Sequence, residues 1–408
     1  MNKIGYLSTY PPTECGIGEY LYFLLRDMRD HNIFTGEVIV FSNKLNGLNK
    51  PRRDINAYIV PSFKWGVPEY EELLRNIRKH GPFDIFHIQH EWNIFPKTQE
   101  FLDFLNELKD HAKKVIITLH TVYHVLYEGF ERVDKYHREI SSLVDTIIVH
   151  SVLQEFELRA QGVDPLKVHR IPHGTTINPY ISEPRDVLAK KLGVNVGDRF
   201  VIVSPGFLRE DKGLDVLVKA IDYVVNDEGR RNVLLVLSGI IQGGLPSLRY
   251  VRKVHEYIVS NDLANNVLFM EKYISRDNML RLFALADVVA MAYKLKEGKY
   301  SISGILHQAL GSFKPIIGTR VSKLIEYYQL LPELAVKPGD YREFGNKIIY
   351  VMDNYDKVLE MMNIVREYVK RTSWINVARE HVRLYKELLR GVTLLLHKYI
   401  VCKLGHIP

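Results

Sequence analysis

A glycine-bounded loop with four charged residues offers the clearest chemistry in the sequence. Residues 206–213 follow a short apolar run and read Gly-Phe-Leu-Arg-Glu-Asp-Lys-Gly. Arginine presents a fork of donors and lysine a compact charge, so Arg209 and Lys212 could together neutralise a diphosphate. The alternative is a solvated loop, in which both cations pair with the two carboxylates between them.

A second polar segment, residues 293–311, leads from an apolar run into a helical pattern that begins near Ser303. It contains Glu297, Ser301 and Gly304. Hydroxyls and unpaired N–H groups at the positive end of a helix are typical of a phosphate site. A plain helix cap at Ser303 is the alternative interpretation.

A turn with two glycines, Gly16 and Gly18, follows the first apolar run and opens a helical pattern. Glycines let the backbone approach a ligand, and the start of a helix offers N–H groups to an anion. The turn lacks the third glycine of a dinucleotide fingerprint and the Lys-Ser/Thr pair of a P-loop. A tight structural turn explains it equally well.

Histidines stand at the ends of several predicted strands, with His90 beside Glu91, then His120, then His173. Each could contact a ligand at a strand end or be a packed, hydrogen-bonded core residue. No pair has the His-Glu-x-x-His spacing of a zinc site, so we predict no metal.

The elements that position these residues alternate between short apolar runs and helical patterns. This alternation predicts parallel sheets with helices on both faces. A proline-containing break near residues 172–184 divides the chain into two doubly wound α/β domains, whose ligands bind beyond the carboxyl ends of the strands. The predicted strands are 3–8, 37–41, 57–60, 85–89, 115–120, 146–150, 168–171, 200–204, 233–238, 267–270, 288–292, 315–318 and 334–336.

Composition agrees with a globular protein of two or three domains. The 408 residues are 46% hydrophobic and 25% charged, with a formal net charge of +7. This mild excess suggests anionic ligands or an acidic membrane surface and is too weak to indicate nucleic acid. Cys15 and Cys402 are the only cysteines, which favours a reducing compartment over a disulfide framework.

The ends of the chain bear on localisation. The first residues read as a strand rather than a signal peptide, and no stretch is apolar enough to span a membrane, so we expect a cytoplasmic protein. Residues 393–401 are apolar around His397 and Lys398. They predict either a helix on the inner face of the membrane or a helix end packed on the body or on a partner.

Taken in order, these motifs resemble the retaining GT-B glycosyltransferases of glycosyltransferase family 4, over nearly the whole chain. The resemblance rests on Thr-Tyr-Pro-Pro at 9–12, Cys-Gly-Ile-Gly at 15–18, His-Ile-Gln-His-Glu at 87–91, Thr-Leu-His-Thr at 118–121, Ile-Pro-His-Gly at 171–174, Gly-Phe-Leu at 206–208, Asp-Lys-Gly at 211–213, Ala-Asp-Val at 286–288, Ser-Gly-Ile-Leu at 303–306, Lys-Pro-Ile-Ile-Gly-Thr at 314–319 and Ser-Trp at 373–374.

The resemblance implies two Rossmann-like domains facing across a cleft, with a C-terminal helix crossing back to the first. The expected parts are an acceptor-side domain at 1–178, a donor-binding domain at 197–372 and the helix at 373–408. It implies that a hexose moves from GDP-mannose, UDP-glucose or ADP-glucose to a hydroxyl of an unknown sugar, glycan or lipid-linked acceptor. The configuration is retained by a same-face displacement, with no cofactor and no obligatory metal.

The resemblance also implies roles for the candidate residues. His120 would contact the donor sugar, and Arg209 and Lys212 would stabilise the diphosphate. His90, Glu91 and His173 would lie on the acceptor side. The implied donor-binding set is Gly16, Gly18, Gly206, Tyr273, Ile274, Tyr300, Ser301, Ser303, Gly304, Ile305 and Gln308.

The chain departs from the family pattern in three places. Tyr300 and Gln308 occupy the positions of a usual glutamate pair, and Gln308 can still bond to a ribose without bringing charge. Glu297 would replace the first glutamate if the loop is shifted. Phe207 stands where an arginine is usual, and Arg209 is the proposed substitute.

Three further readings remain open. A disaccharide synthase or a phosphorylase could use the same fold, and a phosphorylase would accept inorganic phosphate without a nucleotide. The missing glutamate pair also permits an inactive scaffold. A solute-binding protein shares the two-domain layout, although such proteins carry an export signal.

Overall fold

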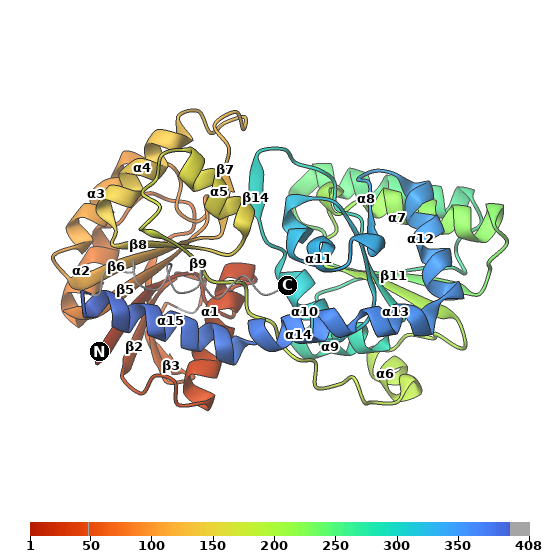
Figure 1. Ribbon diagram of the computed structural model, residues 1–408, viewed down its shortest axis with the longest axis horizontal. Helices are drawn as coiled ribbons and strands as arrows, with labels where there is room; N and C mark the ends of the chain where they lie inside the picture. Colours follow the sequence, from red (N-terminus) through yellow and green to blue (C-terminus); the bar gives the residue numbers. More distant parts are fainter. Residues whose placement is uncertain (48, 392–408) are drawn as a thin grey trace, which may run out of the picture. The chain divides into compact units, whose positions relative to one another are not determined.

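The computed structural model describes residues 1–47 and 49–391, which form two compact units (Figure 1). The first comprises residues 1–174, 297–302 and the C-terminal segment from Trp374; the second comprises 175–296 and 303–373. The chain therefore changes units near the predicted break. It also enters the first unit again for six residues that we expected in the donor-binding domain.

The first unit is built on an eight-stranded sheet of order β3-β4-β2-β1-β5-β6-β8-β9. All pairs are parallel except β3 with β4. The strand order reverses between β1 and β5, which is where such sheets bind ligands. The strands are β1 Lys3–Leu7, β2 Glu37–Asn43, β3 Arg52–Asp54, β4 Ala57–Phe63, β5 Phe83–His90, β6 Ala112–Leu119, β8 Thr146–Val149 and β9 Val168–Arg170.

Both faces of this sheet are buried, because successive side chains of a strand point to opposite sides. On β2, Val38 and Val40 join one hydrophobic cluster, which α1 and α15 cover. Ile39 and Phe41 join the other, which α2, α3 and α4 cover. Figure 1 shows α15 lying beside α1 in this unit. The helices are α1 Gly16–Asp30, α2 Glu71–His80, α3 Gln99–Leu108, α4 Val133–Leu143, α5 Val152–Ala160 and α15 Trp374–Leu389.

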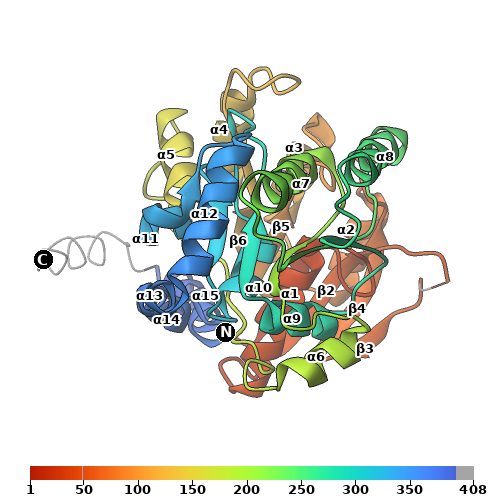
Figure 2. The same cartoon turned by 90° about the vertical axis from the view of Figure 1, so that its right-hand side faces the viewer.

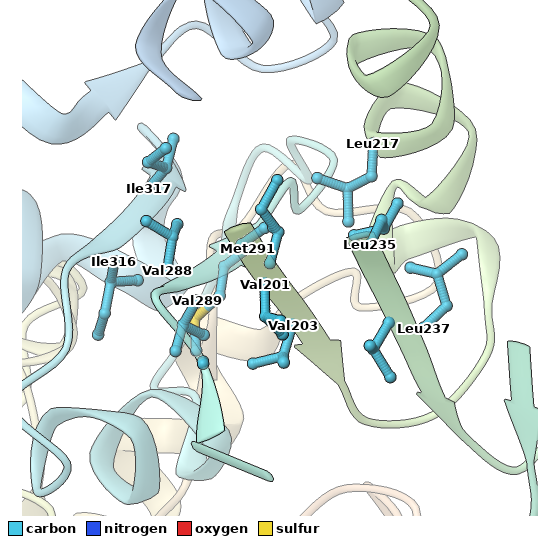
Figure 3. Close-up of a cluster of buried hydrophobic side chains, with 14 of the residues drawn as sticks. Val201, Val203, Leu217, Leu235, Leu237, Val288, Val289, Met291, Ile316 and Ile317 are labelled. Atoms are coloured by element: carbon cyan, nitrogen blue, oxygen red, sulfur yellow. The ribbon is translucent and has the colours of Figure 1, made fainter. Parts of the chain in front are cut away.

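The second unit has an all-parallel sheet of order β12-β11-β10-β13-β15-β16. Its strand order reverses between β10 and β13. Figure 3 shows its core, with Val203 of β10, Leu237 of β11 and Val289 of β13 among the labelled side chains. The strands are β10 Phe200–Pro205, β11 Val233–Gly239, β12 Val267–Glu271, β13 Val288–Met291, β15 Ile316–Thr319 and β16 Ala335–Val336.

Helices surround this second sheet (Figure 2). Those next to the candidate residues are α7 Leu214–Asp222, α8 Gly244–Ser260 and α10 Gly304–Leu310. The others are α6 Arg185–Leu192, α9 Arg276–Leu285, α11 Ile325–Leu330, α12 Tyr341–Asp353, α13 Tyr355–Met361 and α14 Asn363–Thr372. Together the two sheets confirm the predicted pair of doubly wound α/β domains.

Three of the six returning residues form an unpredicted strand. β14 (Lys299–Ser301) pairs antiparallel with β7 (Thr121–Tyr123), and Ser301 lies opposite Thr121. The backbone N–H of His124 also donates to the carbonyl of Gly298 at 2.8 Å. The polar segment between β13 and α10 is therefore partly a strand of the first unit.

Among the described residues, no helix is both long and apolar enough to cross a membrane. The expectation for residues 393–401, and for the helix beyond residue 391, falls outside the described residues.

Candidate active site

The loop after β10 is built so that its cations are held rather than left in solvent. Arg209 donates to both carboxylate oxygens of Asp211, from Nε at 2.9 Å and from Nη2 at 3.0 Å. Its Nη1 donates to Gln242 Oε1 at 2.9 Å. Three fixed contacts orient the guanidinium, which is still about one-third exposed, at 32% of its side-chain surface.

Glycines let this loop pass close to its neighbours. Gly213 has φ +67°, and a Cβ there would overlap the carbonyl oxygen of Ala292. A Cβ on Gly239 would likewise overlap the carbonyl oxygen of Gly206. The loop is therefore packed against the ends of β11 and β13, at the reversal point of the second sheet.

Lys212 lies half-buried with its ammonium 4.0 Å from the centre of the Tyr293 ring. Burial lowers the pKa of Lys212 to about 8, against the opposing attraction of Asp211. Burial also raises the pKa of Asp211, but Arg209 and Lys323 outweigh it and bring the value to about 2. Asp211 is therefore a carboxylate at neutral pH and the common anchor of the cations.

The predicted helix start adjoins this cluster. The Tyr293 hydroxyl lies 3.0 Å from Ser303 Oγ, which also accepts from the N–H of Leu306 at 3.3 Å and so caps α10. Ile305 approaches Gly206, since a Cβ on that glycine would lie 3.9 Å from Ile305 Cγ1. The structure thus brings Gly206, Arg209 and Lys212 together with the first residues of α10, Ser303 to Ile305.

The remaining candidates of the second unit are less closely placed. Gln308 is half-buried one turn further along α10. Tyr273 follows β12 and is 60% exposed, whereas Ile274 is buried in the hydrophobic core. His307 of α10 lies between Thr175 Oγ1 at 2.9 Å and Glu326 Oε2 at 2.8 Å, so it is a packed, hydrogen-bonded residue.

In the first unit, the glycine turn opens α1 at the β1–β5 reversal point. A Cβ on Gly18 would lie 3.2 Å from the Thr9 carbonyl, so this glycine is needed for close packing. A Cβ on Gly16 would meet nothing within 4 Å. The backbone at Gly16 is therefore open to a ligand.

His120 belongs to a buried polar network at the end of β6. Its Nε2 lies 2.8 Å from Gln89 Oε1, and its Nδ1 lies 3.2 Å from His150 Nε2. Burial, with the neighbouring His150, lowers the pKa of His120 well below its usual value. His120 is therefore a neutral imidazole with both nitrogens engaged, and a role with the donor sugar would require one of them to change partner.

The acceptor-side candidates occupy different environments. Glu91 Oε2 accepts from Thr121 Oγ1 at 2.8 Å, which fixes the carboxylate at the end of β5. His90 is fully buried, with its ring centre 4.9 Å from that of Trp92. His173 is half-buried, and its Nδ1 lies 2.8 Å from the Gly174 carbonyl oxygen. Only Glu91 and His173 retain exposed surface.

The segment Glu297–Ile302 places three more candidates in the first unit. Ser301 is buried opposite Thr121, the residue after His120. Tyr300 pairs with Val122 and is half-buried, whereas Glu297 is exposed. Within the first unit, the structure thus groups Ser301 with His120 and Glu91.

Within the described ranges, no group of three or more His, Cys, Asp or Glu side chains could hold a metal ion. Gln242, Lys323 and Tyr293 are the parts of the cationic cluster that our sequence reasoning missed. Tyr293 carried a signal, since it begins the polar segment already singled out; Gln242 and Lys323 carried none. Asp211 is one of the two carboxylates that the alternative interpretation of the loop paired with the cations, and the structure shows that pairing for Arg209.

Two Rossmann-like sheets, each with candidate residues at its reversal point, are the layout expected of the GT-B class. Residues 15–178 match the model of Glycosyltransferase Family 4, and residues 199–354 match that of Glycosyl transferases group 1. The two matches together cover more than half of the sequence. The chain belongs to these family 4 and group 1 glycosyltransferases, and it is therefore an enzyme of sugar transfer.

Solved structures share this architecture at low identity. HepE of Anabaena, in complex with UDP, is 17% identical with a TM-score of 0.70, over 95% of this chain and all (100%) of that one. Sucrose-phosphate synthase of Thermosynechococcus elongatus is 17% identical with a TM-score of 0.73, over 96% and 100%. A glycosyltransferase of Rickettsia africae is 16% identical with a TM-score of 0.73, over 95% and 98%. No curated protein matches the sequence significantly.

Proposed function

We propose that this enzyme transfers a hexose from a nucleoside-diphosphate sugar to a hydroxyl acceptor, with retention of configuration. The observation that carries the proposal is the cationic cluster of Arg209 and Lys212 around Asp211. A diphosphate leaving group gains negative charge as its bond to the sugar breaks. Cations fixed in advance stabilise that charge without reorganising at the moment of reaction.

The step needs no nucleophile from the protein. The acceptor oxygen forms a bond to the anomeric carbon on the face from which the diphosphate departs. The electron pair of the broken bond goes to the departing phosphate oxygen, which takes the proton of the acceptor hydroxyl. The protein contributes by positioning the reactants and stabilising charge. Arg209 and Lys212 supply the positive charge, so we propose that a divalent metal is not obligatory.

The donor base and sugar can be ranked from the comparisons. HepE, which has the same fold, has been solved with UDP-glucose. UDP-glucose is therefore the first donor to test, followed by GDP-mannose and ADP-glucose. In this proposal Tyr273 borders the base and Gln308 the ribose, while Gly16, Glu91 and His120 serve the sugar and the acceptor.

We propose that the first unit binds the acceptor near Glu91 and Ser301, both of which lie beside Thr121. The Thr121 hydroxyl donates to the Glu91 carboxylate, and the buried Ser301 lies opposite Thr121 in the pairing of β14 with β7. A lipid-linked acceptor predicts that the full chain floats with anionic liposomes. A full chain that stays in the soluble fraction would count against a lipid-linked acceptor.

Thermal melting with UDP, GDP, ADP and their sugar conjugates, in EDTA and then in Mg²⁺, tests the proposal. A ligand that binds only the folded state stabilises it by about 2.7 kcal/mol at a hundredfold excess over its Kd. We expect one nucleotide to raise the Tm in EDTA. Arg209→Ala should remove that shift and abolish sugar transfer, while Arg230→Ala, which removes an exposed arginine of the same unit, should change neither.

Failure of every nucleotide to raise the Tm would overturn the proposal. Phosphorolysis of a disaccharide with inorganic phosphate would then identify the phosphorylase, and absence of both activities the inactive scaffold.

A further inference from the structure

We propose that Lys323 is a third cation of the donor site and binds the leaving diphosphate together with Arg209 and Lys212. This inference rests on the proposed function. Lys323 lies in the short 3₁₀ turn Ser322–Leu324 that follows β15, more than a hundred residues beyond the cationic loop.

Geometry puts Lys323 in the same cluster as the loop. Its Nζ lies 3.6 Å from Asp211 Oδ2, the oxygen that also accepts from Arg209 Nη2. Its backbone carbonyl accepts from the N–H of Ser303 at 3.3 Å, so the turn also touches the start of α10. The Lys323 side chain is 25% exposed.

The sheet explains why residues so distant in sequence meet here. β10, β13 and β15 are neighbours, and all three are parallel. Their carboxyl ends therefore lie at one edge, where β10 delivers Arg209 and Lys212, β13 delivers Tyr293, and β15 delivers Lys323. Ligands of such sheets bind at this edge.

Charge balance gives Lys323 a chemical task. Asp211 takes both of its contacts at about 3 Å from Arg209, and one carboxylate cancels only one of the three neighbouring cations. Glu210 and Asp215 pair with Lys294, at 3.1 and 3.4 Å, so Lys294 does not add positive charge to the loop. Lys323 adds a further cation beside Asp211, in a loop where Phe207 stands at the position of the family's usual arginine.

In this proposal Lys323 serves the second phosphate of the donor. A nucleoside monophosphate presents no β-phosphate, so it should depend little on Lys323. The diphosphate and the transition state, in which the β-phosphate oxygen gains charge, should depend on it strongly.

Isothermal titration of UDP, GDP and ADP, and of the matching monophosphates, into the full chain tests the assignment. Lys323→Gln should weaken diphosphate binding about tenfold, as expected for one charge-assisted contact, and leave the monophosphate unchanged. Lys323→Arg should recover most of the loss. Lys357→Gln removes an exposed lysine of α13 as the matched control, and it should change neither affinity.

The ratio of the diphosphate and monophosphate affinities is measured on one preparation, so partial loss of folded protein does not affect it. If Lys323→Gln lowers only the Tm and leaves the ratio unchanged, Lys323 is just a structural counterion of Asp211 and the assignment is overturned. If the native chain binds no diphosphate, the proposed function fails and this inference fails with it.

Discussion

The ammonium of Lys212 lies 4.0 Å from the centre of the Tyr293 ring, in cation–π contact. Tyr293 is almost fully buried, and its hydroxyl lies 3.0 Å from Ser303 Oγ, so the ring cannot easily turn. The ring therefore sets the position of the lysine, while burial makes the lysine easier to deprotonate than an exposed one. This combination gives the proposed reaction an upper pH limit.

Activity should fall as the pH rises through about 8, the pKa to which burial lowers Lys212. The protonated lysine predominates below that pH and is lost above it, so the rate should decline on the alkaline side. Lys212→Arg keeps its charge and should move the decline to higher pH, at a lower rate. The pH profile of kcat/KM for the donor measures this; a profile that stays level from about pH 7 to about pH 10 would show that the ammonium is not required.

Replacing Gly16 by alanine should impair activity without impairing folding. A Cβ at this position meets nothing within 4 Å, and alanine favours a helix start over glycine. If a ligand approaches the backbone here, the added methyl group will collide with it and lower kcat/KM at least about tenfold, an effect of about 1.4 kcal/mol. Steady-state kinetics and urea unfolding of the same variant separate the two effects. Unchanged kinetics would mean that the turn is only structural.

Gly213→Ala should be far more damaging than Gly193→Ala. Both glycines have similar positive φ angles, +67° and +69°, so both variants incur a backbone cost of about 1–2 kcal/mol. Only at Gly213 would the new Cβ overlap a backbone carbonyl, whereas at Gly193 it would meet nothing within 4 Å. Urea midpoints should show the difference. Equal losses for the two variants would contradict the close packing of the cationic loop on β13.

The free energy of unfolding should decrease in mild acid because of buried histidines. Burial lowers the pKa of His90 and of His381 to about 3, and of His137 to about 4. Above about pH 6.5 these histidines are neutral in both the folded and the unfolded state, so they do not change the free energy of unfolding. Below it, the unfolded chain binds protons that the folded chain cannot, at about 1.4 kcal/mol per pH unit for each histidine, until the folded pKa is reached.

His90→Phe tests this acid effect and the role of His90 together. The ring packs against Trp92 and Phe101, so phenylalanine should fit and reduce the acid dependence by one proton. Urea unfolding at about pH 7 and about pH 5 measures the change. Activity should be retained if His90 is a packing residue. A large drop in kcat/KM would instead indicate that His90 has the acceptor-side role implied by the family resemblance.

The sequence predicted the regular elements well because their signals are local. Each buried strand of the two sheets is a short apolar run, and the glycines and charged residues at 206–213 indicate a loop that could bind a ligand. β14 was missed because Lys-Tyr-Ser has no apolar pattern, and its partner β7 lies nearly two hundred residues earlier. Only a three-dimensional pairing makes it a strand.

The residues of the candidate site also differ in whether a local sequence signal reveals them. Arg209 and Lys212 could be found because they adjoin a strand end. Lys323 could not be found in this way, because its proximity to Arg209 and Lys212 depends on which strands are neighbours. No local sequence pattern reveals the order of the strands. The placement of Tyr300 and Ser301 beside β7 likewise required the fold.

Because β14 and α15 complete the first unit, its sequence is not contiguous. When residues 1–174 have been synthesised, the eight strands of the large sheet and α1 exist, but α15, which shares one face of the sheet with α1, begins about two hundred residues later. At about 5–20 residues per second, that face waits roughly ten seconds or more for its second helix. The unit whose strands are synthesised first is thus the last to be completed. Chaperones that protect exposed apolar surface should therefore matter more during synthesis of this chain than during its refolding from denaturant.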